Sequence, residues 1–114
     1  MIGLEGFIAA LRDHAADPET DSGLVVYTVV PVVGALAGQA VRTGVGVDEV
    51  APWPVTPPHW IHLAVGVAFS ATNVGGSPKA GWRAHSRDIK GWGVAAAPAA
   101  AWLAHVRGVL GGAV

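Results

Sequence analysis

The chain of 114 residues contains no cysteine. It cannot form a thioester, or carry out any other thiol chemistry, by itself. Disulfide bonds and zinc sites built from thiolates are excluded for the same reason. The length is within the usual range of one domain, so we expect residues 1–114 to form a single domain with one hydrophobic core.

Charged residues are scarce as well, at 13% of the chain, whereas 52% of the residues are hydrophobic. This balance predicts a folded chain, because disordered chains have the opposite composition. Pro, Gly or His interrupts each mainly apolar stretch before it reaches the roughly 20 residues of a membrane span. Glu5, Arg12 and Asp13 occupy what would be the apolar part of a secretory signal. We therefore expect a cytoplasmic protein that makes no membrane contact.

The few charges are unevenly distributed along the chain. Before residue 73 the only basic residues are Arg12 and Arg42, and all other charges are acidic. After residue 73, Asp88 is opposed by five basic residues: Lys79, Arg83, Arg87, Lys90 and Arg107. This second part either attracts an acidic partner or is an ordinary solvated surface.

Hydrophobic spacing predicts a helix near each end of the chain. The first covers residues 4–15, with apolar side chains on one face at Leu4, Phe7, Ile8 and Leu11. The second covers residues 98–110, because Pro98 suits a first helical turn and two glycines follow the last apolar residue.

The segment between the helices predicts strands and loops. Residues 24–33, 39–47 and 59–63 have strand character. Residues 17–23 and 68–79 are rich in turn-forming residues and predict loops. Residues 51–58 contain four prolines and must form a rigid loop outside any strand ladder. The whole pattern predicts an α+β fold with a small antiparallel sheet of three or four strands.

Residues 53–58, which read W-P-V-T-P-P, resemble the Y-P-x-x-P-P motif that precedes a strand in ubiquitin-conjugating (UBC) enzymes. Residues 81–87 and 102–110 resemble the end of bacterial UBC-like proteins. Those proteins are commonly associated with a ubiquitin-like modifier and a ThiF-type activating enzyme. The resemblance covers most of the chain from about residue 24. It implies a UBC-like fold with an N-terminal helix, a proline-rich loop, a long irregular loop and a C-terminal helix.

The chain departs from the family in its catalytic residues. UBC enzymes use a cysteine thiolate, and an H-P-N tripeptide whose asparagine stabilises the oxyanion. Here the cysteine is missing, and the nearest approach to the tripeptide is Ala71-Thr72-Asn73. The resemblance therefore implies a pseudoenzyme, a catalytically inactive UBC-like domain of a bacterial modifier system. Its expected partner is the ubiquitin-like modifier or the activating enzyme.

Two other functions are open. Ser86, with the adjacent His85 and with Asn73, could serve a transferase or hydrolase, including one that forms an oxyester in place of the lost thioester. Alternatively, tryptophans interleaved with cations could bind a nucleic acid, although the chain as a whole is not basic. No cofactor is expected, since no nucleotide-binding motif is present. No metal is expected either, because His59 and His62 would point to opposite faces of a strand.

The remaining candidate residues divide into a binding set and a structural set. The binding set could grip a carboxylate or phosphate and consists of Lys79, Trp82, Arg83 and Arg87. The structural set is expected to hold the proline-rich and glycine-rich segments onto the core; it consists of Trp53, Pro54, Pro57, Pro58, Trp92 and Trp102.

Overall fold

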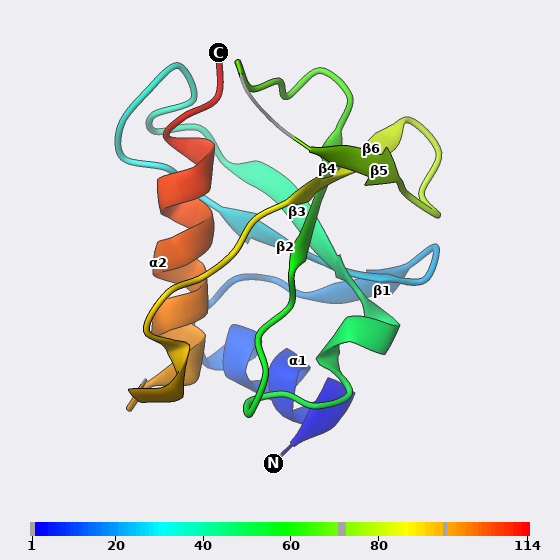
Figure 1. Ribbon diagram of the computed structural model, residues 1–114, viewed down its shortest axis with the longest axis vertical. Coiled ribbons are helices and arrows are strands. Elements are labelled where there is room, and N and C mark those ends of the chain that lie inside the picture. The colour runs from blue at the N-terminus through cyan, green and yellow to red at the C-terminus, as the bar shows by residue number, and fades with distance from the viewer. Residues whose placement is uncertain (1, 71–72, 95) are drawn as a thin grey trace.

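The computed structural model describes residues 2–70, 73–94 and 96–114. Within them the chain forms an α+β fold with two α-helices and one six-stranded antiparallel sheet (Figure 1). The helices are α1 (Gly3–Asp13) and α2 (Pro98–Leu110), with short 3-10 turns η1 (Val47–Val50) and η2 (Trp92–Val94). The strands are β1 (Glu19–Asp21), β2 (Leu24–Val29), β3 (Val41–Gly46), β4 (Trp60–Ala64), β5 (Val74–Gly76) and β6 (Trp82–Ser86).

The spatial order of the strands is β1-β2-β3-β4-β6-β5. Consecutive strands are neighbours from β1 to β4, but β6 lies between β4 and β5. The chain therefore leaves β4, forms the edge strand β5 and returns to fill the space between them. This return places the end of β6 beside the start of β4, where Ser86 is paired with Trp60.

The sheet is larger than the three or four strands that the sequence predicted. The additional strands β1 and β5 are three residues long and lie in segments predicted as loops. Both are edge strands, so backbone pairing on one side is enough to hold them, and their polar or glycine-rich sequences carry little strand signal. Residues 82–86, which are not among the strands that the sequence predicted, form β6, paired on both sides.

Both helices contribute to one hydrophobic core on one face of the sheet. Alternate residues of β2 and β4 enter it, as expected for side chains that share a face: Val25, Tyr27, Val29, Ile61 and Leu63. Phe7 and Leu11 of α1 and four residues of α2 pack against them: Trp102, Leu103, Val106 and Leu110. The predicted helix at 98–110 is confirmed, and α1 ends at Asp13, two residues before the predicted end.

The proline-rich segment lies between η1 and β4 and forms no strand, as predicted. Trp53 anchors it, because the indole is 3% exposed and meets Phe7 edge-on with 4.8 Å between ring centroids. The Trp53 carbonyl accepts a hydrogen bond of 2.8 Å from the backbone N–H of Gly3, and the Trp53–Pro54 peptide bond is cis. Trp92 adds a second ring 5.4 Å from Trp53 and donates from Nε1 to the Pro54 carbonyl.

Three imidazoles give the fold a predicted pH dependence. Burial is the main cause that lowers the pKa of His62, His85 and His105 below the ordinary value of 6.5; Arg87 adds to the effect at His85 and His105, and Glu49 opposes it at His62. The unfolded chain takes up these protons near the ordinary pKa, whereas the folded chain does so only at lower pH. The free energy of unfolding should therefore be fully developed above about pH 6.5 and fall as the pH drops below it.

Urea denaturation at about pH 7.5 and at about pH 5.5 measures this fall. His85→Gln should reduce the difference in the free energy of unfolding between the two pH values, because it removes one of the three imidazoles whose pKa is lowered. A free energy of unfolding that stays constant or rises on acidification contradicts the prediction.

Within the described residues, neither α1 nor α2 is long and apolar enough to cross a membrane.

Candidate functional site

The candidate site lies where the start of β4 meets the end of β6. Ser86 is the last residue of β6 and is paired with Trp60, the first residue of β4. The backbone N–H of Arg87 donates to the His59 carbonyl over 3.0 Å, so the pairing continues one step beyond the strands. The backbone N–H of Ser86 donates to the Asn73 carbonyl, also over 3.0 Å. These bonds fix Ser86 between two neighbouring segments.

Three side chains form a linear array at this position. The hydroxyl group of Ser86 is hydrogen-bonded to Nε2 of His59. The other ring nitrogen of His59, Nδ1, lies 3.0 Å from Oδ1 of Asp88. A hydroxyl, an imidazole and a carboxylate therefore follow one another, each ring nitrogen facing a different partner. This order is the one used by serine nucleophiles that are activated by histidine.

The backbone of His59 is held independently of this array. Its N–H donates to Oε2 of Glu49 over 2.8 Å, a contact from η1. Pro57 and Pro58 precede it and restrict the backbone, and Pro58 is buried. The Trp60 ring stands edge-on to the imidazole with 5.5 Å between centroids. The side chain of His59 is 43% exposed and that of Asp88 is 85% exposed, so the array is open to solvent.

His85 and Asn73, the other candidates for a catalytic role beside Ser86, occupy different positions. The His85 side chain is 1% exposed and packs edge-on against Phe69 at 5.0 Å, so its imidazole is directed into the protein. Asn73 lies next to Ser86 through the backbone hydrogen bond described above. Ala71 and Thr72, the rest of the tripeptide compared with H-P-N, lie outside the described residues.

The predicted binding set is spread along β6 and its flanking turns. Lys79 forms an ion pair of 2.5 Å with Asp21 and lies 5.5 Å from the Trp82 ring centroid, so both residues brace the turn before β6. Arg87 lies beyond the other end of β6, where its guanidinium stacks 4.9 Å from the Phe69 centroid and donates to the Ser86 carbonyl. Arg83 is exposed between these ends.

Arg83 and Arg87 lie in extended chain. In a helix their spacing of four would place both on one face, close together, but Arg83 belongs to a strand and Arg87 follows it. Side chains four apart also share a face in an extended chain, but about 13 Å separates them along the strand. The two arginines are therefore spaced along an extended surface and are not arranged to bind one carboxylate or phosphate together.

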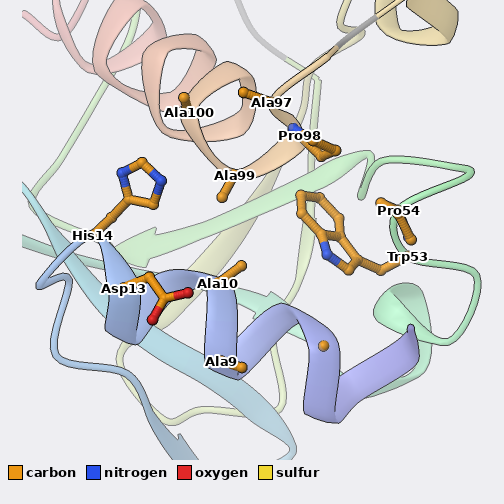
Figure 2. Close-up of a pocket in the computed structure, with 11 residues that line it drawn as sticks. Ala9, Ala10, Asp13, His14, Trp53, Pro54, Ala97, Pro98, Ala99 and Ala100 are labelled. Atoms are coloured by element: carbon orange, nitrogen blue, oxygen red, sulfur yellow. The ribbon is translucent and has the colours of Figure 1, made fainter. Parts of the chain in front are cut away.

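A larger cleft lies elsewhere, between α1 and the start of α2 (Figure 2). Its volume is about 440 Å³, and Trp53 and Pro54 line it together with alanines of both helices. Asp13 and His14 lie at one end, as Figure 2 shows. Most of the lining of this cleft consists of small apolar side chains, so the cleft offers fewer reactive groups than the Ser86 array.

The residues that sequence reasoning missed are His59 and Asp88. His59 and Ser86 are 27 residues apart and meet only because β6 is paired with β4. No local sequence pattern indicates this strand pairing. The sequence therefore pointed to the adjacent His85 as the partner of Ser86. In the described ranges no group of three or more His, Asp or Glu side chains could hold a metal ion.

Comparison of the chain with models of protein families, with curated proteins and with solved structures finds no match.

Proposed function

We propose that the chain is a UBC-like domain that binds a ubiquitin-like modifier or its ThiF-type activating enzyme within a bacterial conjugation system. In this role it acts as a cytoplasmic pseudoenzyme for thioester transfer, because it has no cysteine to accept the modifier. The expected contribution is recognition of a protein partner.

The position of the W-P-x-x-P-P segment carries this proposal. The strands β2, β3 and β4 form an antiparallel meander, and the segment lies in the connection from β3 to β4, directly before β4. The UBC resemblance requires the segment at this place. Its first residue, Trp53, is buried against α1, so the segment is fixed to the core. The order of an opening helix, an antiparallel sheet and a closing helix is compatible with the same scaffold.

The charge distribution supports an acidic partner surface. Arg83 is exposed on β6, and the following residues add Arg87 and the exposed Lys90. Only Asp88 is acidic in this stretch. Such a surface steers an acidic protein toward it and contributes to specificity. Lys79 belongs to the same stretch of sequence, but its ammonium group is already paired with Asp21.

Charge reversal at Arg83 tests this surface. Arg83→Glu should weaken binding to the modifier or activating enzyme about tenfold, and raised salt should weaken binding of the unmodified chain. Calorimetry with a purified bacterial ubiquitin-like modifier and with a purified ThiF-type activating enzyme measures the affinity. Arg12→Glu is the matched control, since Arg12 is also exposed but lies on α1. Absence of binding to either protein overturns the proposal, and equal losses for both variants contradict the surface.

A further inference from the structure

We propose that Ser86, His59 and Asp88 form a nucleophilic site that cleaves activated esters or thioesters through an acyl group carried on Ser86. This activity goes beyond the binding role and does not depend on it. The side-chain array carries the inference: the Ser86 hydroxyl at Nε2 of His59, and the Asp88 carboxylate 3.0 Å from Nδ1.

The order of these contacts defines the chemistry of the imidazole. The Asp88 carboxylate can only accept, so it receives the N–H of Nδ1 and fixes the tautomer in which Nε2 has a lone pair. That lone pair accepts the Ser86 O–H, which makes the oxygen a nucleophile when the proton moves. Asp88 acts as a positioning residue, whereas Ser86 and His59 are the catalytic residues.

The backbone holds the two catalytic residues in register. Ser86 is bonded through its N–H to Asn73, and His59 is bonded through its carbonyl to Arg87 and through its N–H to Glu49. These bonds come from the residue before β5, the residue after β6 and η1, so the nucleophile at the end of β6 and its base before β4 both have defined backbone positions. Preorganisation of this kind is needed for nucleophilic catalysis.

A surface pocket lies beside the array, on the side of His59 and Asp88, and Ser86 is half-buried next to these lining residues. The pocket has a volume of about 230 Å³, and Thr56, Pro57, Pro58 and Ile89 line it beside His59 and Asp88. A pocket of this volume accepts a small acyl group or the extended end of a polypeptide chain. Arg87 also lines the pocket, and its cation lies beside the Ser86 carbonyl. Positive charge at this position favours the oxyanion that develops on an attacked carbonyl group.

The reaction runs in two balanced steps. Ser86 Oγ attacks the carbonyl carbon and its proton passes to Nε2 of His59; the bond to the leaving oxygen or sulfur then breaks, and the leaving group takes that proton. Ser86 now carries the acyl group as an ester. Water attacks this ester and gives a proton to Nε2, and Ser86 Oγ departs with the proton, so a carboxylic acid is released and the site is restored.

A second serine and histidine pair in the same sheet provides an internal comparison. Ser77 Oγ lies 2.8 Å from Nδ1 of His62, but the His62 side chain is 6% exposed. The Ser77 hydroxyl faces Nδ1 of His62, whereas in the proposed site the Asp88 carboxylate faces Nδ1 of His59. The tautomer of His62 is therefore not fixed by a carboxylate at Nδ1. Burial also lowers the pKa of His62, whereas His59 is open to solvent. Ser77 is therefore expected to be inert.

The experiment uses the full chain with p-nitrophenyl acetate, release of nitrophenolate and intact mass spectrometry. An acetyl group should appear on Ser86, located by peptide mapping. Ser86→Ala should abolish this label and His59→Gln should slow its formation at least about 100-fold, which is the usual contribution of a general base. Ser77→Ala should react like the unmodified chain. Ser86→Cys restores a nucleophile beside the same base, should be acetylated at Cys, and shows that the position tolerates substitution.

Asp88 is tested by the rate of acetylation. Asp88→Asn should slow the reaction, because an amide can donate to Nδ1 as well as accept from it and so no longer fixes the tautomer of His59. Glu49 and Arg87, the other charged residues bonded to the His59 backbone, remain in this variant. Asp88→Glu should restore the rate in part. Acetylation confined to lysines, equal labelling of the chain and Ser86→Ala, or an unchanged rate in Asp88→Asn overturns the proposal.

Discussion

Replacing Trp102 by Ala is expected to lower the free energy of unfolding by about 3–5 kcal/mol, the usual cost of removing a buried ring. Trp102 is fully buried in α2, and its Nε1 donates to Oη of Tyr27 over 2.8 Å. Burial raises the pKa of the Tyr27 phenol, so this hydroxyl stays neutral. The substitution leaves a cavity at the centre of the core and also removes the donor that the buried Tyr27 oxygen accepts from.

Urea denaturation followed by circular dichroism measures this loss. Trp102→Phe separates its two causes, because it keeps an aromatic ring in the core but removes the N–H donor. It should cost less than Trp102→Ala, with about 1 kcal/mol assigned to the lost hydrogen bond. A loss below about 1 kcal/mol for Trp102→Ala contradicts the prediction, since it would mean that the ring adds little to the core.

The sequence predicted the elements that depend on local side-chain patterns. The helix at 98–110 was found because its apolar residues recur at helical spacing and face the core after folding. β2 and β4 were found because their apolar residues are dense and β-branched or aromatic. In these segments the local pattern and the tertiary environment favour the same conformation, so the pattern alone is sufficient.

Elements held by the backbone of other segments could not be predicted in this way. Glu19–Asp21 pairs with β2 across a turn in which Ser22 and Gly23 have φ angles of 55° and 80°. Val74–Gly76 contains two glycines and is a strand because β6 provides an edge for it. Neither sequence has an apolar alternation of its own. Their conformation is decided by the partner strand, which no short window of sequence contains.

The candidate site likewise contains one residue that local sequence patterns indicate and two that they do not. Ser86 was recognised as a possible nucleophile because it is a serine beside a histidine, and that reasoning is local. The histidine that contacts it is His59, which comes from the start of β4 and reaches Ser86 through the register of β4 with β6. Asp88 follows Ser86 closely in sequence, but its role becomes visible only when His59 is placed between them. The site is thus a product of strand order.

Trp53→Ala is the second substitution with a large expected effect, again about 3–5 kcal/mol. The indole is 3% exposed and lies between Phe7 of α1 and Trp92, so its loss removes the contact that joins the proline-rich segment to the core. The backbone bond from Gly3 to the Trp53 carbonyl would then hold that segment with little side-chain support. The segment leads directly to His59, so its position also matters for the array with Ser86.

Val55→Ala is the matched control, because Val55 belongs to the same segment but is 82% exposed and should change the free energy of unfolding by less than about 0.5 kcal/mol. Urea denaturation of both variants decides the role of the ring. If Trp53→Ala is as mild as Val55→Ala, the indole is not an anchor. It would then be better explained as part of a binding surface in the cleft between α1 and α2. The main support for the proposed UBC-like scaffold would also be lost, since that proposal needs residues 53–58 fixed firmly between η1 and β4.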